Sequence, residues 1–249
     1  MRYNTRYRST SFFSSEHLPD GVKWLLVSNV AVFLLTFLLA RDEGVLRGVF
    51  AWLALSPYTV FHNWRIWQLA TYLFLHGGIL HLLINMFTLW MFGRTLEQDW
   101  GTRRFLKYYF ICGIGAGLCD VTINALLGRW GTSTIGASGA IYGLLLAFGV
   151  LYPETIILFF FVFPIKAKYF VMIYGAIELY SAMNVNSGVS NFAHLGGMAF
   201  GFIYLKMRFP TLDLEDVRGW YARWKMQRAK RKFQVYLRKQ GSDRDRWVN

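Results

Sequence analysis

Ser138 and His194 are residue types from which nucleophilic catalysis can be built. A serine hydroxyl is a poor nucleophile until a neighbouring base takes its proton, and imidazole is a suitable base near neutral pH. Ser138 stands in the run Gly-Ala-Ser-Gly at the expected start of one helix, and His194 stands near the expected start of a later one. We therefore predict Ser138 as a nucleophile and His194 as its general base.

His81 and Asn85 add polar groups that could stabilise a reaction intermediate. The two residues are four apart, so they share one face of a helix. Attack on a peptide carbonyl creates an oxyanion, which needs hydrogen-bond donors. We predict three donors: the imidazole of His81, the amide of Asn85, and the backbone N–H of Ser138, which is unpaired at a helix N-terminus. His76 lies about 140° from His81 around a helix, and we expect it to point elsewhere.

The composition indicates that these helices lie in a membrane. Hydrophobic residues make up 55% of the chain and charged residues 16%, whereas soluble proteins carry roughly a quarter charged residues. A spanning helix needs about 20 mostly apolar residues. We predict an all-α membrane protein, a bundle of six transmembrane helices at about 24–40, 69–92, 108–127, 136–152, 168–183 and 192–206. Residues 155–164 are too short to span and end in a proline, so we expect a shallow or re-entrant segment there.

The distribution of basic residues predicts the orientation. With six spans and a cytoplasmic N-terminus, 23 of the 27 lysines and arginines fall on the cytoplasmic side, as the positive-inside rule requires. We expect a cytoplasmic segment at 1–22, a membrane domain at 23–208 and a basic cytoplasmic tail at 209–249. The net charge of +13 then needs no nucleic-acid partner. Solvation of the tail is the simpler interpretation, and docking on anionic lipid is the alternative.

The loop at 41–65 is rich in aromatic residues, so we expect it to lie partly in the outer membrane interface. The whole pattern indicates an integral, multi-pass protein, and we expect it in a cell (inner) membrane of bacterial type.

Small residues can bring the predicted nucleophile and base together. Gly139 and Gly143 on one helix, and Gly197 and Gly201 on another, form small-xxx-small pairs that allow close approach of two backbones. Polar residues at membrane depth are costly, so a cluster of them indicates a functional site.

Two further acids, Glu178 and Asp120, could be proposed as a third member that orients His194. We prefer a structural hydrogen bond for each, because a two-residue arrangement can work when packing holds the base.

Simpler interpretations exist for each of these residues. A serine in a helix often bonds a backbone carbonyl, a histidine can line a water cavity, and glycine pairs are common in membrane helices. A transporter or channel would need a continuous polar path, whereas these residues gather in one half of the membrane. A metalloprotease H-E-x-x-H motif and an aspartyl Gly-x-Gly-Asp motif are both absent from the sequence. A zinc site built from His76, His81 and His194 is disfavoured by the helical offset of His76, so we expect no metal and no cofactor.

At these positions the sequence resembles the rhomboid family of intramembrane proteases, over about residues 51–206. The resemblance rests on three motifs, H-x-x-x-N, G-x-S-G and H-x-x-G-x-x-x-G, which read here His81-Leu-Leu-Ile-Asn85, Gly136-Ala-Ser138-Gly139 and His194-Leu-Gly-Gly197-Met-Ala-Phe-Gly201. Each motif alone is weak, but three in the right order on the expected helices are specific.

The resemblance implies a serine endopeptidase that cleaves membrane-anchored protein substrates, single-span ones included, in or near the outer leaflet through an acyl-enzyme. It also implies that Tyr142 stacks on the catalytic histidine. The alternative is a catalytically inactive rhomboid-like protein that binds membrane clients, although such proteins usually lack the serine or the histidine.

Two other elements bear on the resemblance. The family often has W-R-x-x-T before its second helix, and this chain has Gln68 in the place of the arginine, between Trp67 and Thr71. The anchoring of the preceding loop is therefore in question. The run Glu97-Gln-Asp-Trp-Gly101 also looks like a family element, and we expect its role to be structural.

Overall fold

The computed structural model describes residues 18–39, 42–159, 162–183 and 190–208. The chain divides into two units, Met1–Tyr204 and Leu205–Asn249.

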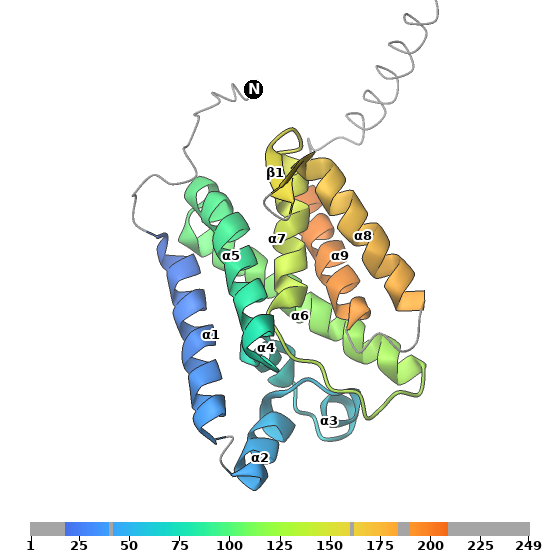
Figure 1. The fold of residues 1–249 in the computed structure, drawn as a ribbon. Coiled ribbons are helices and arrows are strands. Elements are labelled where there is room, and N and C mark those ends of the chain that lie inside the picture. Colours follow the sequence, from blue (N-terminus) through green and yellow to red (C-terminus); the bar gives the residue numbers. More distant parts are fainter. Residues whose placement is uncertain (1–17, 40–41, 160–161, 184–189, 209–249) are drawn as a thin grey trace, which may run out of the picture. The chain divides into compact units, whose positions relative to one another are not determined.

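The described residues are mostly helical (Figure 1). The helices are α1 (Asp20–Leu39), α2 (Glu43–Leu53), α3 (Pro57–His62), α4 (Gln68–Thr71), the 3₁₀ helix η1 (Tyr72–Phe74), α5 (Ile79–Trp100), α6 (Thr102–Leu126), α7 (Ser138–Leu151), α8 (Ala167–Met183) and α9 (Asn191–Arg208). Two short strands, β1 (Ile156–Phe159) and β2 (Phe163–Lys166), stand between α7 and α8.

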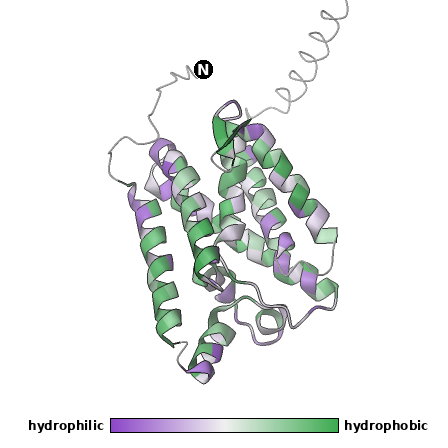
Figure 2. Ribbon diagram, viewed as in Figure 1, coloured by the Kyte–Doolittle hydropathy of each residue, from purple (hydrophilic) through white to green (hydrophobic). Residues whose placement is uncertain are grey.

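The outward faces of several helices are apolar, as expected for a protein whose solvent is lipid. Among the described residues, α1, α5 and α6 are long and apolar enough to cross a membrane. Figure 2 shows hydrophobic residues along most of α1. Large apolar side chains are exposed on α1, α5 and α8, including Trp24, Phe37, Leu38, Ile79, Leu80, Met172 and Tyr180. Exposed apolar surface of this extent must be shielded from water. Together with the helix lengths, it identifies an integral membrane protein.

Helix α7 is the central element of the first unit. It packs against α5, α6 and α8, and Figure 1 shows it between α5 and α8. Most of its residues are buried, and several are glycine or alanine. Two buried tyrosines donate hydrogen bonds to backbone carbonyls of neighbouring helices. Tyr108 donates to the carbonyl of Gly143 on α7 (2.8 Å), and Tyr72 donates to the carbonyl of Gly113 on α6 (2.7 Å). These bonds satisfy hydroxyls that would otherwise be costly to bury.

The second predicted span differs from the observed helix. In place of one helix over 69–92, the chain forms α4 and η1, turns at Leu75, and begins α5 only at Ile79. Gly77 and Gly78 lie at this break, and glycine is unfavourable in the interior of a helix. As a result, His76 lies before α5 rather than on it.

The segment expected to be shallow or re-entrant forms a β-hairpin, which the sequence analysis did not predict. Its antiparallel register pairs Ile156 with Lys166 and Phe159 with Phe163. Hydrogen bonds from Lys166 and Lys168 lower the pKa of the Glu154 carboxyl, which precedes the hairpin, to about 2. An open two-stranded edge leaves backbone groups unpaired, which favours a position outside the hydrocarbon region.

Gln68 anchors the α2–α3 region despite replacing the arginine of the family pattern. It is fully buried, and its side-chain amide donates to the carbonyls of Ala51 (3.1 Å) and Trp52 (3.3 Å). The Thr59 hydroxyl donates to its Oε1 (2.5 Å), and Arg65 adds a bond to the Ala51 carbonyl (2.8 Å). The anchoring role passes to an amide together with a neighbouring arginine.

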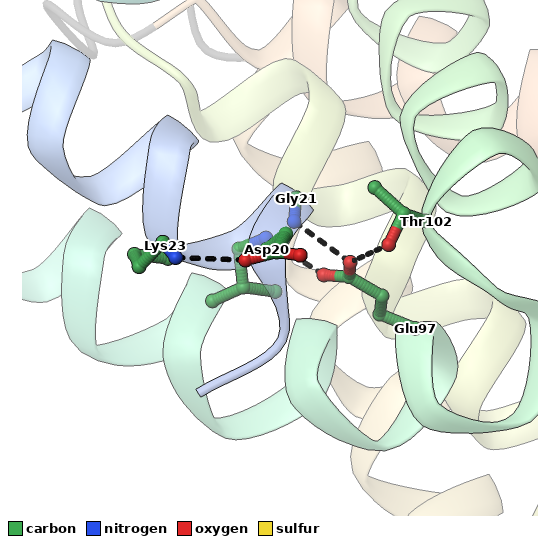
Figure 3. Close-up of polar contacts among 6 residues, drawn as sticks. Asp20, Gly21, Lys23, Glu97 and Thr102 are labelled. Atoms are coloured by element: carbon green, nitrogen blue, oxygen red, sulfur yellow. Dashed lines mark hydrogen bonds and ion pairs between the residues drawn. The ribbon is translucent and has the colours of Figure 1, made fainter. Parts of the chain in front are cut away.

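A buried carboxylate holds the first turn of α1 (Figure 3). Glu97 of α5 is 2% exposed and accepts hydrogen bonds from the backbone N–H groups of Gly21 and Val22, both at 2.7 Å, and from the Thr102 hydroxyl at 2.6 Å. These N–H groups lack partners within the helix, and the N-terminal end of a helix dipole attracts negative charge. A Cβ at position 21 would lie 2.9 Å from Glu97 Oε1, so glycine makes the close approach possible.

We predict that Glu97→Gln destabilises the fold. A neutral amide offers one acceptor oxygen where the carboxylate offers two, so a buried N–H of α1 loses its partner at a cost of about 1–3 kcal/mol. The measurement is thermal or denaturant unfolding in detergent. Glu43→Gln is the matched control, because Glu43 and its partner Arg47 are both 80% exposed and such pairs contribute little. Equal stability of the two variants would contradict the role assigned to Glu97.

Candidate active site

Ser138 is the first residue of α7, and the segment before it is fixed by backbone bonds. Leu55 and Thr134 exchange two backbone hydrogen bonds of 3.0 and 2.8 Å. Gly136 then donates to the carbonyl of Tyr72 (2.9 Å) at a φ of 117°, a conformation that residues with a Cβ rarely adopt. The approach to the helix is therefore determined independently of the Ser138 side chain.

Asp120 on α6 ties this segment to the start of α9. It is fully buried and accepts from Thr134 Oγ1 (2.7 Å) and Asn124 Nδ2 (3.0 Å), and it is also hydrogen-bonded to the Ser190 hydroxyl. Ser190 immediately precedes α9, and its carbonyl accepts from the His194 backbone N–H (3.3 Å). One buried carboxylate thus links the chain before Ser138 with the chain before His194, a structural role that matches the sequence-based expectation for this acid.

The two predicted reacting residues lie next to each other. His194 Nε2 is 2.8 Å from Ser138 Oγ, which is hydrogen-bonding distance, although the residues are 56 positions apart. His194 is 6% exposed and Ser138 is half-buried. A serine hydroxyl can donate to an unprotonated imidazole nitrogen at this distance.

Backbone contact between α7 and α9 sets this distance. A Cβ added at Gly197 would lie 1.9 Å from the carbonyl oxygen of Gly139, and one added at Gly143 would lie 3.2 Å from the carbonyl oxygen of Gly197. Gly201 is close to the Tyr108 hydroxyl, 2.5 Å from where its Cβ would be. The small-residue pairs thus stand where the helices meet.

Tyr142 packs on the imidazole from α7. Its ring and that of His194 are stacked, with centroids 4.2 Å apart and an interplanar angle of 11°. Tyr142 is one turn after Ser138, so one helix presents both the hydroxyl and the ring that lies on the imidazole.

His81 and Asn85 face Gly136, at the approach to Ser138. A Cβ at position 136 would lie 2.7 Å from His81 Nε2 and 3.8 Å from Asn85 Nδ2. Asn85 is 5% exposed and uses one amide hydrogen to bond the carbonyl of His81 (3.0 Å). Its second amide hydrogen is available in principle for another acceptor.

The expectation that His76 points away from His81 was wrong. Because His76 precedes α5, the helical offset does not apply, and the two rings lie edge to face with centroids 5.0 Å apart. Within the residues that the structure describes, no group of three or more His, Cys, Asp or Glu side chains could hold a metal ion.

Glu178 was weighed as a third member that orients His194, and a structural hydrogen bond was preferred for it. Its Oε2 lies 3.0 Å from His194 Nδ1. Tyr142 donates a hydrogen bond to its other carboxylate oxygen. An acid on an otherwise apolar helix was the available signal, but the rotation of α8 toward α9 is not readable from the sequence.

Fold and site together define an integral membrane protein with a half-buried serine next to a buried histidine among its helices. The family model described as the rhomboid domain matches residues 63–211, which is more than half of the chain. The chain belongs to the rhomboid family, as the resemblance predicted.

Similar proteins come from a plant and from a parasite. RHOMBOID-like protein 1 of Arabidopsis thaliana is 35% identical over 60% of this chain and 36% of its own length. RHOMBOID-like protein 2 of the same plant is 34% identical over 74% of this chain and 54% of its own length. Rhomboid-like protease 3 of Toxoplasma gondii is 26% identical over 81% of this chain and 73% of its own length.

The match with RHOMBOID-like protein 1 spans little more than a third of that protein's length. These three proteins come from two eukaryotes, so they give no support to the bacterial-type inner membrane expected from the sequence.

We predict that Gly197→Ala separates the serine from the histidine. The added methyl would meet the Gly139 carbonyl at 1.9 Å, and backbone cannot give way as a side chain can. A displacement of roughly 1 Å in a reacting pair costs on the order of a hundredfold in rate, and overpacking costs about 1–3 kcal/mol of stability.

Hydrolysis of a membrane substrate and unfolding in detergent measure the two effects. Gly175→Ala is the control on α8, where a Cβ would meet only the end of the Met198 side chain, 3.4 Å away. Normal rate and stability in the Gly197 variant would show that backbone contact does not set the geometry.

Proposed function

We propose that this chain is an intramembrane serine endopeptidase that cleaves membrane-anchored proteins. The observation that carries the proposal is the 2.8 Å distance between Ser138 Oγ and His194 Nε2 in a partly buried setting. Membership of the rhomboid family supports the same reaction class. The stacked ring of Tyr142 supports it further, since it restrains the plane of the base.

In the proposed reaction, Ser138 Oγ attacks the scissile carbonyl carbon while its proton passes to His194 Nε2. The C–N bond then breaks, and the same proton leaves with the amine product, so that an acyl-enzyme remains. A water molecule next gives a proton to His194 and attacks the ester carbon. The carbon–Oγ bond breaks, the proton returns to Ser138, and the carboxylic acid product departs.

The oxyanion formed in each half-reaction needs donors where charge develops. We assign these to the backbone N–H of Ser138 and the side chains of His81 and Asn85. The positions of His81 and Asn85 around Gly136 support the assignment, because a glycine there leaves space beside both side chains. Backbone N–H groups in the first turn of a helix have no partner within it.

The topology we propose has six spans, with both termini cytoplasmic. A membrane domain at 23–208 would join a short segment at 1–22 to a basic tail at 209–249, and anionic lipid is the partner that a basic tail would take. The 23 of 27 basic residues on one side support this orientation. Substrates would then be cut in or near the outer leaflet.

We predict that Ser138→Ala and His194→Ala each abolish hydrolysis of a single-span substrate while the fold is retained. Removing either member of such a pair eliminates the activated nucleophile.

In the same assay Asn85→Ala should lower kcat about a hundredfold with KM nearly unchanged, since the donor acts on charge that exists only during reaction. A fluorophosphonate probe should label the unmodified protein at Ser138, and EDTA should have no effect.

The result also separates an enzyme from a client-binding relative. Undiminished turnover by the Ser138 or His194 variant would overturn the mechanism. Failure of the unmodified protein both to cleave and to be labelled, with substrate still bound, would instead indicate an inactive rhomboid-like binding protein.

The orientation is tested with topology reporters. A reporter that is active only on the cytoplasmic side should be active when fused after Asn249, and it should be inactive when inserted after Arg129, in the segment between the third and fourth proposed spans. The reverse pattern would reject the proposed orientation.

A further inference from the structure

A buried acid on α8 lies directly behind the histidine of the site. Glu178 is 7% exposed, and its Oε2 is 3.0 Å from His194 Nδ1, on the opposite side of the ring from Ser138. Neither of these two atoms has a hydrogen-bond partner among the other described residues. An unpartnered carboxylate oxygen within a membrane protein is costly, and so is an unpartnered imidazole nitrogen. Each atom therefore has the other as its available partner.

We propose that Glu178 is a positioning residue that fixes the tautomer and orientation of His194. The proposal rests on the proposed function and adds a third member to the serine–histidine pair. To take a proton from Ser138, Nε2 must be unprotonated, so in the neutral ring Nδ1 must carry the hydrogen. A carboxylate facing Nδ1 favours that tautomer, because it can only accept.

Tyr142 connects the acid and the base through two contacts. Its hydroxyl donates to Glu178 Oε1, and its ring is stacked on His194 with centroids 4.2 Å apart. The carboxylate is thus held at one oxygen by the tyrosine while it presents the other to the imidazole. Fixing a catalytic base from a second layer of residues is a recurrent requirement of precise sites.

The negative charge also has a role when the reaction proceeds. As Ser138 loses its proton to Nε2, the ring becomes positively charged in surroundings of low polarity, where charge–charge attraction is strong. Glu178 stabilises that imidazolium without taking the proton, as the acid of a serine–histidine–acid triad does. The order along the chain, Ser138, Glu178, His194, is also the order found in the α/β-hydrolases.

Other charged groups near His194 do not fill this position. Asp120 on α6 interacts with the ring electrostatically, but hydrogen bonds from Ser190, Thr134 and Asn124 occupy its oxygens. His81 on α5 also interacts with His194 electrostatically, but an imidazole has no negative charge with which to stabilise a protonated His194. Of the two acids raised by the sequence, Glu178 is the one within bonding distance of Nδ1.

Glu178→Gln in the full-length protein in detergent tests the proposal. The amide has the same size, but it can offer either oxygen or nitrogen to Nδ1, so the tautomer is no longer fixed. We expect kcat per active site, titrated to completion with a fluorophosphonate, to fall on the order of a hundredfold or more, with KM within about twofold. Tyr142→Phe, which keeps the stacked ring and removes the donor, should show a smaller fall.

Two further variants calibrate the result. Glu154→Gln is the matched control, because its exposed carboxylate pairs with Lys166 and Lys168 outside the site and full activity is expected. Glu178→Asp keeps the charge but shortens the side chain, and it should restore part of the activity lost in the glutamine variant.

A spectroscopic readout separates positioning from structural support and needs no turnover. In ¹⁵N-histidine NMR, with the signals of His194 assigned by their loss in His194→Ala, the unmodified protein should show the Nδ1-protonated form, and Glu178→Gln should show a mixture. Unchanged tautomer and kcat in Glu178→Gln would overturn the proposal.

A fall in titratable sites or melting temperature with kcat per site unchanged would overturn it too, since that is what structural support alone predicts. If the unmodified protein neither cleaves nor is labelled, the proposed function fails separately, and the ¹⁵N spectra still decide whether Glu178 positions the ring.

Discussion

Direct backbone contact between α7 and α9 is the constraint on which the rest of the site depends. A Cβ at Gly197 would lie 1.9 Å from the carbonyl oxygen of Gly139, so the two backbones meet directly where Ser138 Oγ and His194 Nε2 lie 2.8 Å apart. In a membrane the hydrophobic effect does little to press helices together, so small residues and close packing must do so. The surrounding helices supply further groups that contact the pair, and Asp120 on α6 ties the segment before Ser138 to the segment before His194.

Three buried carboxylates in this fold differ in the hydrogen-bond partners that stabilise their charge. Asp120 is fully occupied by hydroxyl and amide donors, and Glu97 by backbone N–H groups and a threonine. Glu178 differs, because among the described residues one of its oxygens faces only the imidazole nitrogen of His194. A carboxylate whose oxygens are bonded by backbone, hydroxyl or amide donors has a structural role. A carboxylate that faces a titratable ring is coupled to the chemistry of that ring.

Much of the fold and site could be predicted from the sequence, and the failures have physical causes. Apolar runs between charges located α1 and α6 to α9 closely, and helix order with the small-residue pairs placed Ser138 beside His194. The stacking of Tyr142 on His194 was predicted from the family resemblance. The break before α5 was missed because hydropathy stays high through residues 69–92, although Gly77 and Gly78 marked it. The hairpin was missed because a short apolar run is compatible with a strand or a buried segment. The contact of Glu178 depends on how α8 is rotated, which no local pattern records.

The cap on α1 has a consequence for how the protein meets bilayers of different thickness. Glu97 holds this helix through the amides of its first turn and not through its side chains, so that one end is fixed to α5. Beyond the first turn, Leu25, Asn29 and Thr36 are buried, and most other side chains of α1 are exposed and apolar. A mismatch between the length of α1 and the local hydrocarbon core would therefore be accommodated by tilt about the fixed end, with the displacement greatest near Leu39. Helix α7, held on several sides, would keep its position while the helix at the edge adjusts.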